Sequence, residues 1–414
     1  MSRTFFDAHC HVFSLSHPNF LGFIEGLRHR SLEAIYSQVS SPNFLLTSFF
    51  SKGGERIRNL MSVMEMEPGE VFELMEDDLL GRYAKAGDGA PLLRGGELRI
   101  GTYRFDRLLI VPLVVDFAHT DPFHGDAYYD HLPPKRVETQ VRELLAGIRH
   151  YRHARPGGFL EIRPFLGVNP SMRSGKGLAA LVEATFAGWR GGASASHAAF
   201  DAMSGTAADR EAEEAPPNAF AGIKLYPPLG FDPWPDEGAE REKAEWLYSF
   251  CEARSIPIVT HCDDQGFRNL RLEEAWRYSS PGRWRKILER HPGLRVDFAH
   301  FGMRWSIRLG QSHDSSWTEE IMDLMLRYEG VHADLSFNGC DAEYYPYFQS
   351  LIEKRSAVER EVIIGRTLFG SDFMVNLMRV RSYSDYLRLF ADSPLSDEWK
   401  LRFGSENPAR FLFG

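Results

Sequence analysis

The residues best suited to chemistry stand near the start of the chain. Asp7, His9 and His11 alternate with small or apolar residues in the stretch 4–13. Because alternate side chains of a β-strand lie on one face, a strand here would point one carboxylate and two imidazoles at the same spot. Imidazole nitrogen is a common ligand of zinc and related ions. The spacing therefore predicts half of a metal site, although polar residues at a frayed chain end would show the same pattern.

Similar polar residues end three later apolar runs. His261 ends the run 256–262, His300 lies near the end of 295–302, and Asp372 follows the run that begins at 367. A lone histidine at a strand end more often makes a structural hydrogen bond, but recurrence together with a His-x-His strand favours one shared site. Nitrogen ligands with a carboxylate suit Zn²⁺ best, and Mn²⁺, Fe²⁺ and Co²⁺ remain alternatives. An ion with an open position would lower the pKa of a bound water toward ~7.

These residues need a scaffold that brings strand ends together. Eight strands are predicted, near residues 5, 110, 163, 223, 258, 297, 333 and 369, and helical segments separate most of them. This alternation predicts an α/β fold of the (β/α)8 TIM-barrel type, in which the carboxyl ends of the strands converge on one mouth. The rival is an open doubly wound sheet. No glycine-rich dinucleotide fingerprint or phosphate loop follows the first strand, which weakens that rival.

Two insertions interrupt the pattern. Residues 18–105 are too long for an ordinary loop, and we interpret them as a mainly helical insertion that covers the site, with a separate small domain as the alternative. Residues 191–217 are rich in Gly, Ala, Ser, Asp and Glu, which predicts a solvated, flexible loop. The prediction is therefore one barrel domain over residues 1–414.

The amino-acid composition indicates which kinds of binding partner to expect. The chain has 414 residues with 48 Lys and Arg against 57 Asp and Glu, a formal charge of −9. That balance argues against a nucleic-acid partner. No apolar run reaches the length of a membrane span and no signal pattern opens the chain, so we expect no membrane association. The four cysteines lack disulfide or Cys-x-x-Cys spacing, which predicts a cytoplasmic protein. A small-molecule substrate is expected, and formation of a homo-oligomer stays open.

The ordered set of motifs resembles the amidohydrolase superfamily, and more narrowly the amidohydrolase-2 family. The matching motifs are Asp7-x-His9-x-His11, Pro-Ile-Val-Thr-His261, Phe-Ala-His300-Phe-Gly and Leu-Phe-Gly-Ser-Asp372-Phe. Gly-Ile-Lys-Leu-Tyr-Pro and the closing Glu-Asn-Pro-Ala-Arg-Phe-Leu-Phe-Gly are also typical of that family. The resemblance spans the chain apart from the two insertions. It implies a metal-dependent barrel.

The resemblance also implies roles for single residues. His9, His11, His261 and Asp372 would bind the metal, and His300 would act as an acid–base or substrate-orienting residue or bind a second metal. Asp372 would also accept a proton from the attacking water.

Lys224 has three open interpretations: a carboxylated lysine that bridges two metals, a cation that holds a substrate carboxylate, or a lysine that snorkels to the surface. Arg163, Arg268 and Asn338 are weaker candidates for substrate contacts; each is otherwise a surface or hydrogen-bonding residue.

Several activities remain open at this point. The first is hydrolysis of an amide, ester or lactone bond in a small, carboxylate-bearing substrate by a metal-activated water. The alternative is a lyase, a metal-dependent non-oxidative decarboxylase of an aromatic or unsaturated acid. The opening Asp-Ala-His-Cys-His-Val also resembles TatD-like nucleases, which are shorter and carry a mid-chain glutamate ligand that has no counterpart in this sequence. A barrel kept only as a scaffold would have lost ligands, and the mononuclear set is complete.

Overall fold

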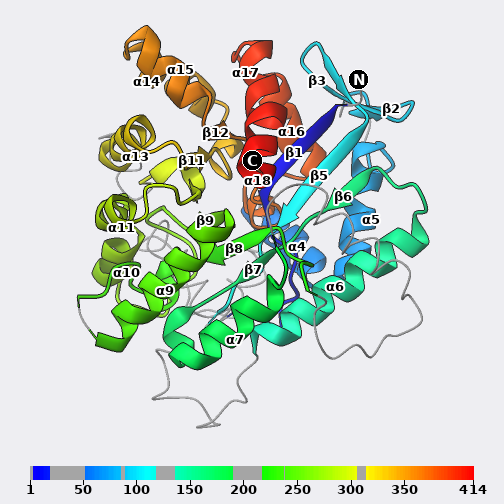
Figure 1. The fold of residues 1–414 in the computed structure, drawn as a ribbon. Coiled ribbons are helices and arrows are strands. Elements are labelled where there is room, and N and C mark those ends of the chain that lie inside the picture. The colour runs from blue at the N-terminus through cyan, green and yellow to red at the C-terminus, as the bar shows by residue number, and fades with distance from the viewer. Residues whose placement is uncertain are drawn as a thin grey trace, which may run out of the picture.

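The fold alternates parallel β-strands with α-helices (Figure 1). A computed structural model describes residues 3–18, 52–84, 89–117, 136–189, 217–236, 238–304 and 314–414. The parallel strands are β1 (Thr4–Cys10), β5 (Arg107–Pro112), β6 (Leu160–Ile162), β7 (Phe165–Gly167), β8 (Gly222–Leu225), β9 (Ile258–Thr260), β10 (Val296–Phe298), β11 (Val331–Asp334) and β12 (Thr367–Leu368). Each predicted strand coincides with one of these, except that the strand predicted near residue 163 is divided into β6 and β7.

The division between β6 and β7 changes the pairing partner. Strand β6 pairs with β5, whereas β7 pairs with β8. Between them, the amide of Arg163 donates to the carbonyl of Ile110 and the carbonyl of Pro164 accepts from Ala221. Because proline has no N–H to donate, the ladder with β5 stops at this point. The chain then continues as a strand of the neighbouring sheet.

The parallel strands form two sheets that meet at two seams. The strand orders are β1-β5-β6 and β12-β11-β10-β9-β8-β7. An isolated parallel bridge joins Leu113 to Phe165, and another joins Cys10 to Phe373. At the second seam the amide of Ala8 also donates to the carbonyl of Phe369 at 3.0 Å. Backbone hydrogen bonds therefore connect the first strand to the segment that follows the last one.

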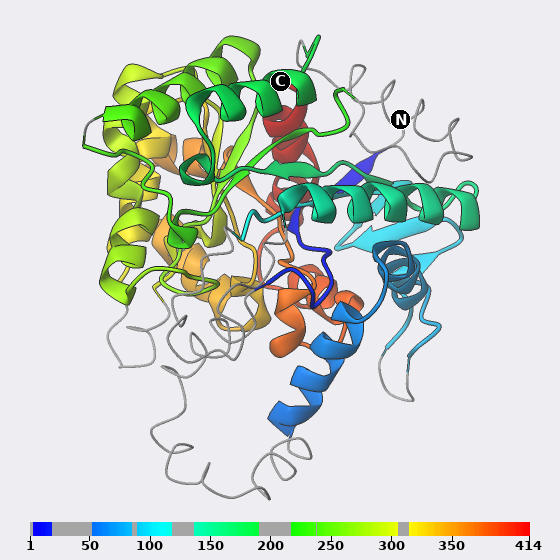
Figure 2. The same cartoon turned by 90° about the horizontal axis from the view of Figure 1, so that it is seen from below.

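Helices lie outside the strands and follow them along the chain (Figure 2). Their apolar sides bury against the outer faces of the strands, which are themselves almost wholly apolar, as is usual for parallel sheets. These outer helices are α6 (Val137–Ala154), α7 (Gly175–Thr185), α9 (Gly238–Arg254), α10 (Leu272–Ser279), α11 (Arg285–Arg290), α13 (Ser316–Arg327), α14 (Tyr344–Glu353), α15 (Ala357–Ile364), α16 (Tyr383–Ala391) and α17 (Asp397–Leu401). The last helix, α18 (Asn407–Phe413), packs differently.

A second, smaller apolar cluster lies on the inner faces of the strands. Its strand residues include Phe6, Leu109, Phe165 and Val259. Helix α18 adds Phe411 and Leu412 to the same cluster, so the end of the chain packs against the inner side of the strands. The inner side is therefore mostly apolar near the starts of the strands, where the ring of His332 also packs against Phe411.

The described part of the segment between β1 and β5 is helical and also contains a small sheet. It holds α4 (Lys52–Met64), α5 (Pro68–Leu79) and an antiparallel sheet of β2 (Leu93–Arg94), β3 (Glu97–Ile100) and β4 (Tyr103–Phe105). Helix α5 packs on α6, and α4 packs on the short helix η6 (Val375–Met378) that follows Asp372. The small sheet was not predicted from the sequence. The polar stretch 191–217 lies outside the described residues apart from its last residue.

Within the described ranges, no helix is long and apolar enough to cross a membrane. The four cysteines, Cys10, Cys251, Cys262 and Cys340, all carry free thiols, and the first three are buried.

Substituting Gly222 should destabilise the fold, because strand β8 meets Phe165 at this position. A Cβ atom at Gly222 would lie 2.4 Å from Cε2 of Phe165 and 2.6 Å from the carbonyl oxygen of Pro257. Overpacking of this kind costs about 1–3 kcal/mol, so we expect Gly222→Ala to lower the midpoint of urea unfolding. The control is Gly175→Ala, where the nearest atom would be 3.8 Å away. Equal midpoints for the two variants would contradict this packing.

His332 should make stability depend on pH. Burial lowers its pKa to about 3, opposed by a hydrogen bond to the carbonyl of Gly330 and reinforced by Arg366. Between pH 6.5 and 3 the unfolded chain takes up a proton that the folded chain does not, so the free energy of unfolding falls as pH falls through that window. In His332→Gln we expect a shallower slope, by up to about 1.4 kcal/mol per pH unit.

Urea unfolding at a series of pH values from 7.5 to 4.5 measures this slope. The control is His153→Gln, which replaces an exposed histidine on α6. Parallel curves for wild type and His332→Gln would contradict the assignment.

Candidate metal centre

A β-bulge in β1 decides which side chains face inward. The pairing of β1 with β5 shifts register between Asp7 and Cys10. Ala8 belongs to the inner apolar cluster, whereas Cys10 belongs to the outer core beneath the helices. The extra residue lets Ala8 and His9 face inward one after the other, and His11 follows on the same side. Bulges often re-aim side chains beside active sites in this way.

Asp7 lies on the opposite side from the two histidines, which corrects the prediction that all three share a face. Its carboxylate accepts hydrogen bonds from the amide of Ser371 at 2.8 Å, the hydroxyl of Ser371 at 2.6 Å and the hydroxyl of Tyr383 on α16 at 3.0 Å. Burial raises the pKa of Asp7 to about 7, against the lowering effect of those hydrogen bonds. Simple alternation failed here because it assumed an unbroken strand.

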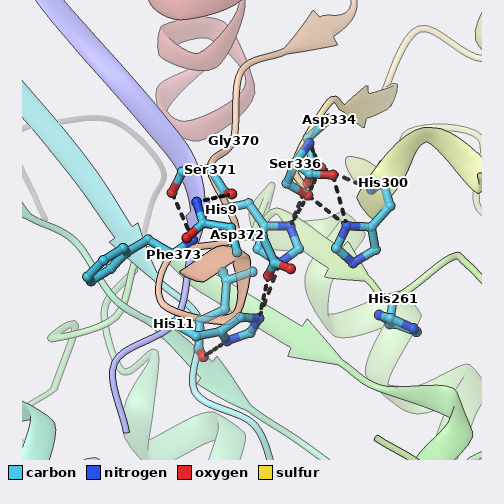
Figure 3. Close-up of polar contacts among 12 residues, drawn as sticks. His9, His11, His261, His300, Asp334, Ser336, Gly370, Ser371, Asp372 and Phe373 are labelled. Carbon is cyan, nitrogen blue, oxygen red and sulfur yellow. Dashed lines mark hydrogen bonds and ion pairs between the residues drawn. The ribbon is translucent and has the colours of Figure 1, made fainter. Parts of the chain in front are cut away.

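Three ligand atoms converge at the carboxyl end of β1 (Figure 3). Nε2 of His9 lies 3.3 Å from Nε2 of His11. Oδ1 of Asp372 lies 3.5 Å from the first of these nitrogens and 3.4 Å from the second. The three residues, which we name the ligand triad, are buried. The amide of Asp372 donates to the carbonyl of His9 at 2.7 Å, so the backbone sets the approach of the carboxylate.

Hydrogen bonds assign the tautomer of both triad histidines. Nδ1 of His9 lies 2.7 Å from Oδ2 of Asp334, and Nδ1 of His11 lies 2.8 Å from the carbonyl oxygen of Leu113. Both partners accept, so each Nδ1 must donate and each Nε2 carries a lone pair. Burial lowers the pKa of His9 to about 3 and holds that of His11 well below its ordinary value. Both imidazoles are therefore neutral at pH 7.

The triad fits a divalent cation. Two imidazole lone pairs and a carboxylate oxygen face one another, and the imidazoles have no proton to share among them. Ligand atoms about 2.0–2.1 Å from a tetrahedral zinc ion lie about 3.3–3.4 Å apart, which matches the three separations. Each histidine is also anchored through its other nitrogen, as ligand histidines normally are.

His300 faces the same region from the end of β10. It lies in η4 (Ala299–Gly302) with a backbone φ of 62°, in the left-handed region. Its amide donates to Oδ1 of Asp334 at 3.0 Å, and its carbonyl accepts from Nδ2 of Asn338 at 2.7 Å. Nδ1 lies 3.2 Å from the carbonyl oxygen of Ser336, so Nδ1 donates and Nε2 keeps its lone pair. Burial lowers the pKa of His300 to about 4.

His261 does not join the ligand triad. Its Nε2 lies 2.9 Å from Oδ1 of Asp263 and 2.9 Å from the carbonyl oxygen of Gln265. Its ring stacks on that of Tyr226, with centroids 4.1 Å apart, and its centroid is 5.1 Å from that of His300. The structure thus brings together three of the four predicted ligands, and Figure 3 shows His261 apart from them. The imidazole of His261 faces the carboxylate of Asp263 instead. A role for His261 as a ligand stays a prediction.

Lys224 is buried inside the strands rather than extended to the surface. Its side chain is 1% exposed, and Nζ has no hydrogen-bond partner among the described residues. Burial lowers its pKa to about 8, and the negative charges of Asp334 and Asp372, together with Asp297 and Asp263, oppose that lowering. The snorkelling interpretation is therefore wrong. A buried amine among carboxylates remains compatible with the other two interpretations.

The three weaker candidates lie in different places. Arg163 pairs with Glu161 at 2.5 Å and lines a cleft of about 620 Å³ with residues of α5 and α6, at the starts of the strands. That cleft lies at the opposite ends of the strands from the ligand triad. Arg268 is half-buried in the loop between β9 and α10. Asn338 contacts the backbone of His300, so the structure shows it supporting His300.

Sequence reasoning missed three polar residues beside the site. Asp334 and Ser336 lie at the end of the strand predicted at 331–338, and Asp263 follows the strand predicted at 256–262. The same signal that identified His261 and His300, a polar residue at a strand end, applies to all three. Asp334 holds Nδ1 of His9, and Asp263 holds Nε2 of His261.

Comparison with known proteins places these residues in a family. No curated protein matches the chain. The chain is similar to the solved structure of a probable 2-pyrone-4,6-dicarboxylic acid hydrolase from Acinetobacter baumannii, with 11% identity, a TM-score of 0.45 and coverage of 99% of this chain and 98% of that one. It is also similar to the structure of a 4-oxalomesaconate hydratase from Rhodopseudomonas palustris, with 12% identity, a TM-score of 0.44 and coverage of 99% of this chain and 95% of that one. A third similar structure is that of an amidohydrolase from Burkholderia multivorans, with 12% identity, a TM-score of 0.43 and coverage of 100% of both chains.

A protein-family model described as "Amidohydrolase" covers residues 6–414. The match includes both triad histidines, His261, His300 and Asp372, and it continues to the last residue of the chain. The chain therefore belongs to the amidohydrolase-2 family of metal-dependent hydrolytic enzymes.

Proposed function

We propose that this chain hydrolyses an amide, ester or lactone bond in a small molecule that bears a carboxylate. The observation that carries the proposal is the convergence of the ligand triad, in which Nε2 of His9, Nε2 of His11 and Oδ1 of Asp372 lie within 3.5 Å of one another. These three atoms are acceptors in a buried site. A cation is the partner that satisfies all three at once.

The scaffold proposed for this site is one closed (β/α)8 barrel that spans the whole chain. Support comes from the two seams, where Leu113 bridges to Phe165 and Cys10 bridges to Phe373. The second bridge joins the edge strand β1 to the segment after the edge strand β12, and the first joins the residue after β5, the middle strand of the three-stranded sheet, to the edge strand β7. The inner apolar cluster, which receives residues from β1, β5, β7, β9 and β12, is the expected filling of such a barrel.

Zinc is the ion that we propose for the triad, because two imidazole nitrogens and one carboxylate oxygen are common zinc ligands. Mn²⁺, Fe²⁺ and Co²⁺ are the alternatives with overlapping ligand preferences. A divalent ion held here supplies a Lewis acid and lowers the pKa of a water that it binds.

His300 is the residue that we propose for proton transfer. Its lowered pKa keeps the ring neutral at pH 7, and the hydrogen bond from Nδ1 to Ser336 leaves Nε2 as the atom that accepts a proton. Its ring centroid lies 5.0 Å from that of His9. A proton accepted at Nε2 is thus held next to the triad and returned from the same atom to the leaving group.

Lys224 is the residue that we propose for recognition of the substrate. A buried ammonium without a hydrogen-bond partner is costly unless an anion pairs with it, and a carboxylate is the simplest anion that a small substrate can offer. The same pairing would serve the alternative reaction, non-oxidative decarboxylation, which uses the same residues. The two reactions are distinguished by their products: decarboxylation releases CO₂, whereas hydrolysis frees an alcohol or amine group.

The amount of bound zinc should depend on the residues of the ligand triad. We expect purified wild type to hold about one Zn²⁺ per chain, and His9→Ala and Asp372→Ala to lose stoichiometric zinc because each removes a converging ligand atom. His300→Ala should keep it, since His300 does not contact the triad atoms, and His261→Ala tests whether the predicted ligand His261 also holds the ion. Elemental analysis after dialysis against a zinc buffer measures the content.

His291→Ala is the control for the loss of a buried histidine. Nδ1 of His291 lies 3.1 Å from Oε2 of Glu252, and this pair is not part of the site. Stoichiometric zinc in His9→Ala would count against the triad. Loss of zinc in His261→Ala would make His261 a further ligand, and loss in His300→Ala would indicate a second metal.

Replacing Lys224 should affect only substrates that bear a carboxylate. On a panel of esters and lactones, each assayed as the free acid and as its methyl ester, we expect Lys224→Met to raise KM for the acids by roughly 10- to 100-fold, the worth of a hydrogen bond to a charged group. The methyl esters should change little. Equal losses for both forms would contradict carboxylate recognition, and mass spectrometry of the intact chain detects carboxylation of Lys224 directly.

A further inference from the structure

Ser336 occupies a position between two rings of different proposed roles. It lies two residues beyond the end of β11 and is fully buried. Its Oγ lies 2.9 Å from Nδ1 of His300 and 3.1 Å from Nδ1 of His9. The hydroxyl also donates a short hydrogen bond to Oδ1 of Asp334. One oxygen atom therefore contacts both histidines and a carboxylate (Figure 3).

The single hydroxyl hydrogen settles the direction of these contacts. A serine hydroxyl has one donor and two acceptor lone pairs. Because the hydrogen goes to the carboxylate of Asp334, the two lone pairs of Oγ are left to accept. Nδ1–H of His300 donates to Oγ at 2.9 Å, and the one Nδ1–H of His9 is shared between Oδ2 of Asp334 at 2.7 Å and Oγ at 3.1 Å. Every hydrogen-bonding position of this hydroxyl is then used. Each ring carries its proton on Nδ1 and keeps the lone pair on Nε2.

Asp334 alone does not provide this link. Its Oδ2 reaches Nδ1 of His9 at 2.7 Å, but the contact that it makes with His300 is to the backbone amide, at 3.0 Å. Among the described residues, Ser336 is the one side chain that hydrogen-bonds to both rings. Gly370 packs against the pair, since a Cβ there would lie 2.7 Å from Cβ of His9 and 3.1 Å from Cβ of Ser336. The serine therefore has little room to change its position.

We propose that Ser336 is a positioning residue that fixes the tautomer and the orientation of His9 and His300 together. One hydroxyl would keep Nε2 of His9 directed at the metal and Nε2 of His300 directed at the substrate. The assignment of roles to the two rings rests on the function proposed above. The placement of both Nδ1 protons does not depend on it and can be observed directly.

The test compares Ser336→Ala with wild type by low-field proton NMR of the full-length protein, where hydrogen-bonded imidazole N–H protons resonate. Loss of a signal in His9→Gln or His300→Gln identifies each ring. In Ser336→Ala we expect both Nδ1–H signals to move upfield and the His300 proton to exchange faster with water. We also expect the zinc dissociation constant to rise about 10-fold, a common effect of losing a partner of a ligand histidine.

The matched control is Ser384→Ala. Ser384 is a buried serine whose hydroxyl donates to Oδ1 of Asp78 at 3.0 Å, so this variant loses the same kind of hydrogen bond outside the site. It should leave both imidazole signals and the zinc affinity unchanged. Unchanged signals in Ser336→Ala, or a change in one ring alone, would overturn the proposal. If wild type binds no zinc while the NMR result is as expected, the proposed function fails and the placement of the two protons by Ser336 stands.

Discussion

The seam between β1 and the segment after β12 is the constraint on which the site depends. The amides of Ala8 and Met374 donate to the carbonyls of Phe369 and His11, at 3.0 and 3.1 Å, and two further amides, those of Ser371 and Asp372, donate to the carbonyl of His9. These backbone hydrogen bonds join residues near the two ends of the chain in one network. The ligand triad is built across this network, so any shift of the seam moves Asp372 relative to the two histidines.

The network places groups of opposite character on the two sides of β1. Asp7 turns toward Ser371 and Tyr383, while His9 and His11 turn inward to Asp334, Leu113 and Asp372. Burying this many polar groups is costly unless each has a partner, and nearly every one of these atoms has one. Among the described residues, the Nζ of Lys224 and both carboxylate oxygens of Asp297 have no hydrogen-bond partner, and the three converging acceptors face one another without a donor. We assign the converging acceptors to the metal and Nζ of Lys224 to the substrate.

Several residues with an unusual backbone conformation lie at the same place. His300, Phe337 and Asp372 all adopt positive φ values, which are uncommon for residues other than glycine. Each lies just after a strand end, and hydrogen bonds to the site's own residues hold His300 and Asp372. Strain of this kind persists where the surroundings over-determine the conformation, and it is typical of functional sites. The apolar inner cluster beneath supplies the rigid support that this requires.

Much of this arrangement could be predicted from the sequence. Long apolar runs separated by amphipathic helices predict parallel strands, and the carboxyl ends of parallel strands converge, so the sequence alone predicts that His9, His11, His261, His300 and Asp372 lie near one another. Asp334 and Ser336 carried the same signal, but nothing in their spacing distinguished a residue that holds a ligand from an ordinary strand end. The small antiparallel sheet before β5 has strands of two to four residues, which are too short for a periodicity to appear.

The amino-acid sequence by itself determined the strands, their order along the chain, and which polar residues stand at their ends, because burial and periodicity are local properties. The tertiary structure decided the rest. The bulge that separates Asp7 from His9 exists only as a register shift against β5, and the turn of His261 toward Asp263 and Gln265 depends on the path of the following loop. The pairing of Arg163 with Glu161 depends on a strand that changes partners. Each of these is a relation between segments that no local pattern records.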